Sequence, residues 1–568
     1  MKCDVAIIGG GPAGSTTGCY LRKYGNDLNV AIFEREKFPR DHVGESQLPP
    51  ISRILDEIGC WDKVEAANFP IKLGATYRWG KNPEPWDFEF IPRKLFKNES
   101  RPAKYEGQRQ WTAFQVDRAI YDDILLKHAA EMGCDVREES KVVQVYREGD
   151  RVKGIELDDG EIVTARHYVD ASGHAGFLRR AMGVQKRAPT SLQNIAIWDY
   201  WQNAEWAEEI GVGGTMVQVL SVGYGWLWFI PMGPTRTSIG FITHADYYKS
   251  CKMRPEELYR KAMAEEPRVR QLTRNATCED KLQTTNDWSF LADRMTGENW
   301  FLVGESGGFA DPILAAGLSL AHKAAQEAAF TMLEIDRGEQ DAAWLRDQYQ
   351  IGQSKRVENH IRFADYWYST NAQFEDLKDH TAKIAADNGL DLSPDKAWQW
   401  LAQGGFIDEE LTIGLAGYGL EQVKHLGEHL TDLQTKDFVP NCNVFKLELE
   451  GAVRTERAKY AEGRVDRCPC FIRGKRVLPV ISVIDLVVTL LQRATDRPTI
   501  ARDLREVAER YKEAPSFLTY VLAPFQMTLE AMILDGWVSA SYDPAIPMTP
   551  LPNHSDFMEW LRMGSPAG

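Results

Sequence analysis

The sequence predicts an α/β fold that carries an inserted strand-rich region and continues into a mainly helical C-terminal part. An apolar run at residues 5–8 leads directly into a glycine-rich turn and a helix, which indicates a parallel-sheet unit of the Rossmann-like kind. Alternating apolar segments between residues 193 and 243 indicate strands, and charged helical patterns follow residue 341. A chain of 568 residues is long enough for two or three domains.

The composition fits a folded enzyme and argues against several other classes. Apolar residues make up 43% of the chain and aromatic residues 11%, while the net charge is −15, which disfavours a nucleic acid as main partner. We find no signal peptide and no apolar run of membrane-spanning length, so the prediction is a cytoplasmic protein without a membrane partner. Nine scattered cysteines indicate neither a disulfide framework nor a metal site.

The first strand, turn and helix predict a dinucleotide site. The first glycine of the motif permits the tight turn, the second lets the backbone approach a pyrophosphate, and the last lets helix and strand pack closely. Amides at the start of the helix suit phosphate. Glu34 ends the next strand, 20 residues past the motif, where an acid can accept hydrogen bonds from a ribose. The motif residues are Gly9, Gly10, Gly11, Pro12, Ala13 and Gly14.

Two further segments carry a family resemblance. Trp226 and Trp228 stand two residues apart in a strand that ends at Ile230-Pro231, so both face the same side. Residues 69–74 read Phe-Pro-Ile-Lys-Leu-Gly and contain Lys72. Together with the nucleotide motif, these segments resemble the flavin-dependent halogenases, whose signature is Trp-x-Trp-x-Ile-Pro. Residues 69–86 resemble the carrier-protein-dependent branch, similar to the chloramphenicol- and chondrochloren-pathway halogenases.

The resemblance implies FAD as the cofactor, in a fold of the aromatic hydroxylase superfamily. Glu305 stands where relatives usually have Asp, which keeps the carboxylate but moves it outward by one methylene. Asp287 matches an Asp that carries a covalent flavin in the chloramphenicol-pathway halogenase; a covalent ester and a polar residue near the flavin edge both stay open. The implied FAD contacts beyond the glycine motif and Glu34 are Arg40, Gly44, Glu45, Ser46, Gln115, Arg118, Asp170, Ser172, Gly173, Asp287, Glu305, Pro312 and Gly317.

The same resemblance assigns the catalytic roles. Lys72 would capture hypohalous acid, either as a neutral amine that forms a chloramine or as an ammonium that hydrogen-bonds the acid. Trp226 and Trp228 would line the passage from flavin to substrate. The backbone amides of Ala316 and Gly317 would hold the halide, although the hydroxyls that relatives carry beside them are absent from this chain.

The predicted activity is halogenation of an aromatic or acyl substrate, with carrier-tethered forms included, by reduced FAD, dioxygen and chloride or bromide. A separate flavin reductase would supply the reduced FAD. Leu314 replaces a Glu of the tryptophan halogenases, which disfavours free tryptophan. Two alternatives remain: a flavin-dependent monooxygenase (hydroxylase) or reductase of the same superfamily, and a flavin-binding partner of a carrier protein without catalysis.

The predicted domains are a catalytic domain at residues 1–375 and a mainly helical domain at residues 376–568. The β-rich substrate part of the catalytic domain is expected at about residues 65–110 and 185–295. Residues 440–470 lack a regular pattern. A helix that begins near Pro498 and a strand near residues 537–542 predict a winged-helix-like module.

Overall fold

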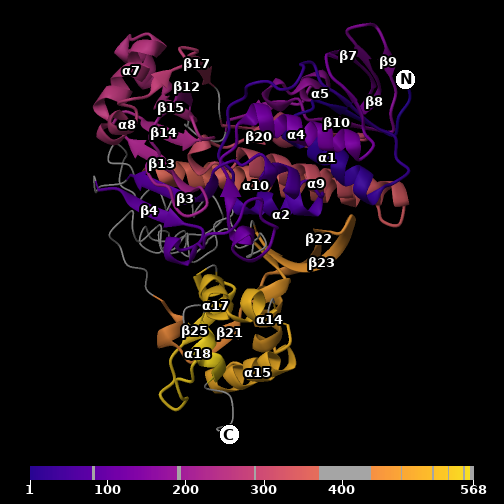
Figure 1. Ribbon diagram of the computed structural model, residues 1–568. Helices are drawn as coiled ribbons and strands as arrows, with labels where there is room; N and C mark the ends of the chain where they lie inside the picture. Colours follow the sequence, from indigo (N-terminus) through magenta and orange to yellow (C-terminus); the bar gives the residue numbers. More distant parts are fainter. Residues whose placement is uncertain are drawn as a thin grey trace. The chain divides into compact units, whose positions relative to one another are not determined.

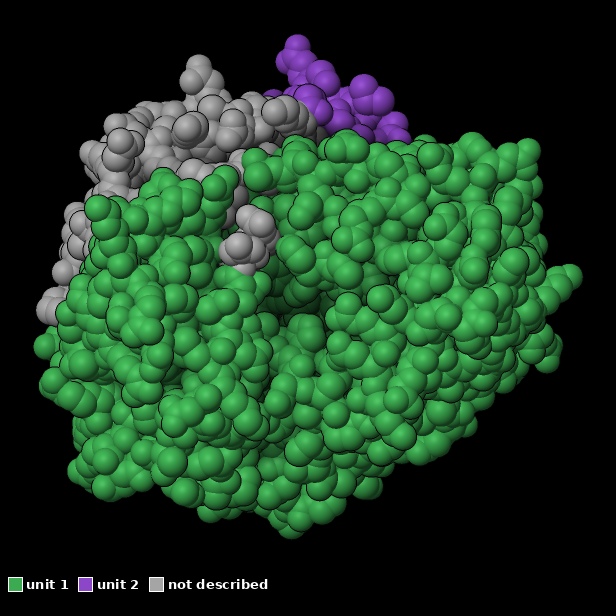
Figure 2. Space-filling model, turned by 90° about the horizontal axis from the view of Figure 1, so that it is seen from above, with its two compact units in different colours: residues 1–373, 460–466 green, residues 374–459, 467–568 purple. Residues whose placement is uncertain are grey.

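The chain forms two compact units, shown in Figures 1 and 2. Unit 1 comprises residues 1–373 and 460–466, and unit 2 comprises residues 374–459 and 467–568. The structure is a computed structural model. It describes residues 1–79, 84–188, 193–286, 289–369, 437–474, 476–514, 517–534, 536–553 and 557–562.

Unit 1 is built on a five-stranded parallel sheet, which confirms the predicted α/β fold. The central strand pairs in parallel with the strands on either side, and every residue of the three strands is buried. Burial on both faces explains why the sequence shows continuous apolar runs here instead of alternation. The strands in sheet order are β19 (Trp300–Leu302), β10 (His167–Asp170), β1 (Val5–Ile8), β2 (Val30–Phe33) and β6 (Asp135–Arg137).

Helices from distant parts of the sequence pack beside this sheet. They are α1 (Pro12–Tyr24), α4 (Arg118–Glu131), α9 (Gly317–Arg337) and α10 (Ala342–Ser369). α1 packs on α4 and α9 (Figure 1). His322 of α9 joins the three, because Thr16 of α1 lies 2.8 Å from Nδ1 and the Tyr121 hydroxyl of α4 lies 2.8 Å from Nε2. Burial lowers the pKa of His322 to about 3, so this link is uncharged at neutral pH.

A nine-stranded sheet forms the inserted region of unit 1, as predicted. One face packs against α7 (Pro255–Glu265) and α8 (Pro267–Leu272) in an apolar cluster that includes Leu227, Phe229 and Phe241 (Figure 1). Alternation along the strands sends Trp226 and Trp228 to the opposite face. The strands in order are β16 (Thr277–Cys278), β12 (Asn194–Gln202), β15 (Arg236–His244), β14 (Trp226–Pro231), β13 (Gly214–Ser221), β3 (Ile71–Arg78) and β4 (Trp86–Glu89), with β17 (Gln283–Asn286) beside β12 and β5 (Ala113–Phe114) beside β3.

Smaller elements complete unit 1. Two three-stranded sheets have the orders β7-β8-β9 and β11-β18-β20. The strands are β7 (Val142–Glu148), β8 (Arg151–Leu157), β9 (Ile162–Val163), β11 (Lys186–Arg187), β18 (Phe290–Ala292) and β20 (Gly308–Phe309). The helices are α2 (Pro49–Glu57), α3 (Trp61–Ala66), α5 (Phe177–Ala181) and α6 (Ala245–Cys251), with short 3₁₀ turns at Arg93–Leu95, Gly107–Trp111, Gly173–Ala175, Gly304–Ser306 and Pro312–Leu314.

Unit 2 has its own apolar core, which includes the fully buried Phe445, Phe525 and Trp537. Asp496 caps α15 by accepting the Thr499 amide at 2.9 Å, so the predicted helix start is confirmed. The elements after residue 436 are β21 (Val444–Leu447), β22 (Val453–Ala461), β23 (Arg464–Arg473), β24 (Arg476–Pro479), α14 (Ser482–Leu491), α15 (Arg497–Arg510), a π-helical turn (Leu518–Leu522), α17 (Phe525–Leu534), β25 (Val538–Ser541) and α18 (Phe557–Arg562). The end of β22 and the start of β23, within residues 460–466, belong to unit 1.

One expectation for this part of the chain was wrong. Residues 440–470 are not irregular, because they contain β21, β22 and most of β23. Their alternation was hidden by charged side chains, since both faces of β22 are largely solvated. The predicted domain boundary at residue 375 and the winged-helix-like module stay predictions. Within the described ranges, no helix is long and apolar enough to cross a membrane.

Candidate functional site

The glycine-rich turn has the geometry of a phosphate cradle. Gly9 has φ +105°, and a Cβ there would lie 2.4 Å from the Ala171 carbonyl oxygen. A Cβ on Gly14 would lie 1.9 Å from the Gly9 oxygen, so only glycine lets α1 pack this closely. Gly11 is different, because its Cβ would meet nothing nearer than Arg40 Nη2 at 3.6 Å. The open space at Gly11 lies before the N-terminus of α1, where backbone amides favour an anion.

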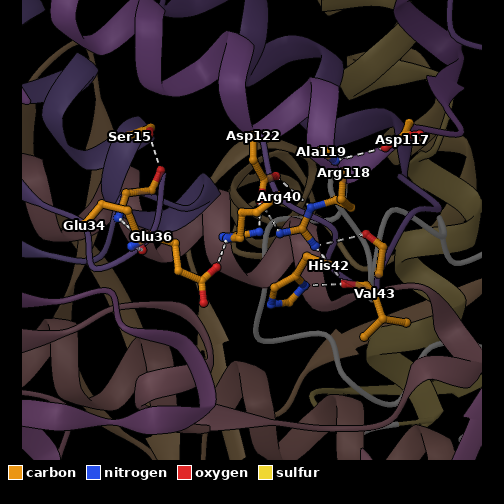
Figure 3. Close-up of polar contacts among 12 residues, drawn as sticks. Ser15, Glu34, Glu36, Arg40, His42, Val43, Asp117, Arg118, Ala119 and Asp122 are labelled. Atoms are coloured by element: carbon orange, nitrogen blue, oxygen red, sulfur yellow. Dashed lines mark hydrogen bonds and ion pairs between the residues drawn. The ribbon is translucent and has the colours of Figure 1, made fainter. Parts of the chain in front are cut away.

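Glu34 lies across this turn, as Figure 3 shows. Its Oε2 accepts the Gly10 amide at 2.7 Å and its Oε1 accepts the Glu36 amide at 2.9 Å. The predicted ribose acceptor is therefore buried at the glycine motif and held in one orientation by two backbone donors.

An arginine network lies next to the glycine turn (Figure 3). Arg118 Nε and Nη2 donate to the two oxygens of Asp122 at 2.7 and 2.9 Å, and Nη1 donates to the Val43 carbonyl at 2.9 Å. Arg40 adds a second guanidinium at 3.1 Å from Asp122. Arg118 is the main influence that holds the pKa of the Asp122 carboxyl below its usual range despite its burial. Arg40 Nε also pairs with Glu36 at 3.2 Å, so the two guanidinium and two carboxylate charges balance. What the network offers a phosphate is a set of guanidinium N–H donors.

Buried polar atoms without hydrogen bonds lie next to this network. Ser46 Oγ and both amide atoms of Gln47 and Gln115 are inaccessible to solvent and make no hydrogen bond of normal geometry. Ser46 and Gln115 pair as neighbours in an isolated bridge, so these atoms belong to one polar edge. Because buried polar atoms are almost always paired in folded proteins, this edge fits a polar ligand such as a flavin ring.

Three carboxylates predicted to contact the cofactor lie in different surroundings. Burial raises the pKa of Glu45 to about 7, and its Oε1 accepts the Tyr200 hydroxyl at 3.2 Å. Burial also raises the pKa of Glu305, whose Oε1 would lie 3.8 Å from a Cβ on Gly317. Asp170 instead bonds within the protein, since Ser172 Oγ lies 2.6 Å and the Arg179 amide 3.0 Å from its oxygens. Gly173 follows in a left-handed conformation.

The predicted halide position is the start of α9. Pro312 opens a 3₁₀ turn capped by Asp311, Ala315 adopts φ +53°, and the helix begins at Gly317 with Ala316 buried before it. The first amides of a helix have no partner within it, so this position suits an anion. Asp287 lies outside the described residues.

Lys72 is buried on β3 with 2% of its surface exposed. Its Nζ donates to the Gln47 carbonyl at 2.9 Å and lies 5.4 Å from the centre of the Phe90 ring. It makes no ion pair with any residue that the structure describes, and burial lowers its pKa to about 7. At neutral pH the neutral amine is therefore well populated, which a reactive amine requires.

A β-bulge sets the direction of the Lys72 side chain. β3 pairs with β13 in parallel, with Lys72 opposite Thr215 and Gly74 opposite Met216, so one extra residue of β3 stands between the two pairs. Thr215 shares its sheet face with Val219, the partner of Trp228. The bulge thus brings Lys72 to the face that carries the tryptophans, although regular alternation from Tyr77 would send it to the other face.

The two signature tryptophans are buried and held by hydrogen bonds. Trp226 Nε1 donates to the Tyr368 hydroxyl at 2.8 Å, and Trp228 Nε1 donates to Ser238 Oγ at 3.0 Å. Their ring centres are 6.1 Å apart. A Cβ on Gly240 would lie 2.1 Å from the Trp228 ring, so glycine leaves the space that this ring fills. The resulting wall is aromatic and apolar.

The structure brings together most of the predicted site residues, and it adds several that sequence reasoning missed. The Arg118–Asp122 spacing of four residues on a predicted helix was an available signal for Asp122. Tyr368 and Asn194 gave no such signal, because their bonds to Asp311 at 3.2 and 3.0 Å join remote segments. The same holds for Gln47, whose carbonyl holds Lys72. The residues fit FAD, because they supply an open glycine turn, two arginines and a buried polar edge whose atoms lack hydrogen bonds.

Comparisons with known proteins agree with this geometry. The family described as FAD binding domain matches residues 2–364. The tryptophan 2-halogenase of Chondromyces crocatus is 33% identical over 354 residues, which span 61% of this chain and 64% of that protein. A chlorinase of 1H-pyrrole-2-carbonyl peptidyl-carrier protein from Pseudomonas fluorescens is 30% identical over 385 residues, which span 65% of this chain and 84% of that protein.

Solved structures support the same assignment. The myxobacterial chondrochloren halogenase CndH has 26% identity and a TM-score of 0.60, covering 76% of this chain and 97% of its own. CmlS, a flavin-dependent halogenase, has 23% identity and a TM-score of 0.70, covering 97% of this chain and 98% of its own, and so shows the fold. The family match over more than half of the chain and the coverage of the pyrrolyl chlorinase place this protein among the flavin-dependent halogenases, a family of FAD-binding enzymes.

Proposed function

We propose that this protein halogenates an aromatic or acyl substrate tethered to a carrier protein, using reduced FAD, dioxygen and chloride or bromide. Lys72 carries the proposal: it is a buried amine, bonded to a backbone carbonyl, on the same sheet face as Trp226 and Trp228. When bound, reduced FAD would supply the chemistry that converts dioxygen and halide to hypohalous acid.

The role proposed for Lys72 is to hold the electrophilic halogen. A neutral amine reacts with hypohalous acid to form an N–halogen bond and water, and the halogen then passes to an electron-rich carbon of the substrate as that carbon loses its proton. A pKa near 7 supports this role over the ammonium alternative, because the free amine is present under ordinary conditions.

The tryptophan wall serves as the proposed barrier between cofactor and substrate. Trp226 and Trp228 are buried, tied to Tyr368 and Ser238, and adjoin Trp79 and Trp198 at ring-centre distances of 6.4 Å. Large rings fixed in this way leave little freedom for a substrate to approach the flavin directly. Direct oxygenation by the hydroxylase alternative would need that approach.

The substrate proposal rests on two observations. One relative is named for a pyrrolyl group on a peptidyl carrier protein, and residues 69–86 resemble the carrier-dependent branch. Another relative is named for tryptophan, but Leu314 replaces the Glu of the tryptophan enzymes. We therefore propose a carrier-tethered aromatic acid as substrate and expect free tryptophan to be a poor one. A flavin reductase partner and a cytoplasmic location remain predictions from the sequence.

Mass spectrometry of products tests the proposal. Purified protein, FAD, a flavin reductase and either chloride or bromide would be given pyrrole-2-carboxylate on a phosphopantetheinyl carrier, the same acid free, or free tryptophan. We expect a halogen isotope doublet on the tethered acid that vanishes without halide and with Lys72→Ala. Product that gains oxygen without halide would favour the monooxygenase instead, and efficient halogenation of free tryptophan would contradict the substrate proposal.

A further inference from the structure

One surface segment of unit 1 is rich in basic residues. Residues 93–111 contain six basic and two acidic residues, and carboxylates outside the segment pair with its three arginines, so its unpaired cations are three lysines. The basic residues are Arg93, Lys94, Lys97, Arg101, Lys104 and Arg109, and the acidic ones are Glu99 and Glu106. We refer to residues 93–111 as the lysine segment.

The three arginines of the lysine segment fix it in place. Glu65 of α3, whose side chain is fully buried, pairs with Arg101 at 3.0 Å and with Arg109 at 2.7 Å, and it accepts the Ala103 amide at 3.2 Å. Arg93 pairs with Glu89 at 2.6 Å and also with Asp87 and Glu208. The backbone of the lysine segment is thereby held on unit 1 before any partner arrives.

The three lysines differ from the arginines in their surroundings. Lys94, Lys97 and Lys104 are exposed and make no ion pair with any described residue. Two large apolar side chains are exposed in the same segment, Leu95 by 55% and Trp111 by 43%. Lys97 and Gln108 are joined by a reciprocal pair of backbone–side-chain bonds of 2.7 and 2.8 Å, which keeps the two ends of the segment together. A surface with free cations and exposed apolar groups suits an acidic protein partner.

A cavity of about 600 Å³ adjoins the lysine segment, within the range of small-molecule sites. Arg101 and Pro70 line it, together with Gly213 and two carboxylates, Glu205 and Glu209. Pro70 immediately precedes β3, the strand of Lys72, and the Ile71 amide donates to the Gly213 carbonyl at 3.0 Å. Arg101 thus belongs both to the lysine segment and to a cavity beside the start of β3.

We propose that the lysine segment is the docking surface for an acidic carrier protein and that the adjoining cavity receives its phosphopantetheinyl arm. The inference rests on the proposed function and adds a location to it. The arm carries a phosphodiester anion, which the three exposed lysines would attract, since Arg101 is already paired with Glu65. Because the lysines are unpaired and solvated, their contribution is to attract and orient the carrier, and it weakens with salt.

Charge reversal at the three lysines tests the docking surface. The variant Lys94→Glu/Lys97→Glu/Lys104→Glu would be titrated with a holo carrier protein bearing pyrrole-2-carboxylate, and Kd measured at low and moderate salt. A matched control reverses Lys141, Lys252 and Lys281, which are also exposed and free of ion pairs among the described residues. We expect the first variant to weaken carrier binding about 10-fold or more and to flatten its salt dependence, with the control near wild type. FAD binding should be equal in all three proteins.

The outcomes separate this inference from the proposed function. Equal carrier affinity in the two charge-reversed variants would overturn the docking surface, even if the wild-type protein halogenates the tethered acid. A variant that loses transfer of reduced FAD from the reductase while binding the carrier normally would also overturn it, because the lysine segment would then serve the reductase. Absence of halogenated product from every substrate would instead count against the proposed function.

Discussion

Unit 1 buries two basic side chains with proposed functions, Arg118 in the nucleotide half and Lys72 in the inserted sheet, and their surroundings shift their pKa values in opposite directions. Arg118 is fastened to Asp122 by two bonds below 3 Å, and its pKa is raised. Lys72 has a backbone carbonyl as its acceptor, and burial lowers its pKa to about 7. Both side chains are almost inaccessible to solvent. Burial alone therefore does not determine the charge state of either group.

The difference follows from what each group is proposed to do. A residue that binds phosphate needs a permanent charge, and a nearby carboxylate preserves that charge in a site poor in water. A residue that bonds to an electrophile needs a free electron pair, and desolvation without a counterion provides it. Under these proposed roles, the presence or absence of one carboxylate separates a cofactor-binding cation from a reactive amine.

The largest expected effect comes from removing the reactive amine. Lys72→Ala should lower halogenation about 100-fold or more, because the proposed N–halogen bond cannot form without the amine. FAD content should stay at the wild-type level, since the glycine turn and Arg118 are untouched. The measurement is product formation at saturating reduced FAD, together with the flavin spectrum. Halogenation near the wild-type rate would remove Lys72 from the mechanism.

The predicted FAD-binding site is tested most directly by a substitution at Gly11. Gly11→Val should abolish FAD binding, because its side chain would occupy the open space before α1. The fold should survive, since the substituted Cβ has no contact nearer than 3.6 Å and the φ of −67° suits any residue. The purified variant is expected to be colourless with a wild-type circular dichroism spectrum. A yellow variant would still bind FAD, and would show that the turn serves only to pack α1 against the sheet.

Asp122→Asn would make Arg118 resemble Lys72 by removing its counterion. We expect a loss of about 3–5 kcal/mol in the free energy of unfolding, because a buried guanidinium would lose its pair. The control is Asp123→Asn on the same helix, whose partner Lys127 is mostly exposed, and it should cost less than about 1 kcal/mol. Urea denaturation measures both. Equal losses would mean that the buried pair contributes no more than a surface pair.

Sequence reasoning predicted these two regions unequally well. The strand, turn and helix around Gly9–Gly14 depend on local spacing, so their form could be predicted from the residues alone. The site in the inserted sheet depends on long-range pairing: the bulge at Lys72 is created by its partner β13, and Trp226 is held by Tyr368, which is 142 residues away. The unpaired amides of Gln47 and Gln115 also follow from burial, which no local pattern reveals.

A smaller effect is expected from pH. If the free amine of Lys72 reacts, the rate should rise about tenfold per unit below pH 7 and level off above it. Glu45 also has a pKa of about 7, so the profile must be repeated with Glu45→Gln, in which the Lys72 step should remain. A rate that falls as the pH rises through 7 would favour the ammonium alternative.

The titration of Lys72 should also make the free energy of unfolding depend on pH. The pKa of Lys72 is about 7 in the folded protein and 10.5 in an ordinary setting, so the unfolded chain binds an extra proton between these values. Burial of the Lys72 ammonium therefore lowers the free energy of unfolding by its full amount below pH 7. This loss becomes smaller as the pH rises and disappears near 10.5. The difference in stability between Lys72→Met and wild type should shrink over that interval.

The smallest expected effect concerns the tryptophan wall and is tested by Ser238→Ala. The substitution removes the acceptor for Trp228 Nε1 and costs about 1 kcal/mol of local stability. The ring should stay in place, because Gly240 leaves room for it and Trp198 lies beside it at 6.4 Å. We expect the ratio of halogenated product to reduced FAD consumed to fall two- to threefold, through a looser ring.

Gly240→Ala is a companion variant whose ratio of halogenated product to reduced FAD consumed is compared with that of Ser238→Ala. Its methyl group would lie 2.1 Å from the Trp228 ring, so the ring must move instead of merely loosening. The loss of coupling between reduced FAD and product should therefore exceed that of Ser238→Ala, with Lys72 and the arginine network unchanged. If both variants keep wild-type coupling, the wall does not separate cofactor from substrate, and the burial of Lys72 alone must keep the halogen from escaping.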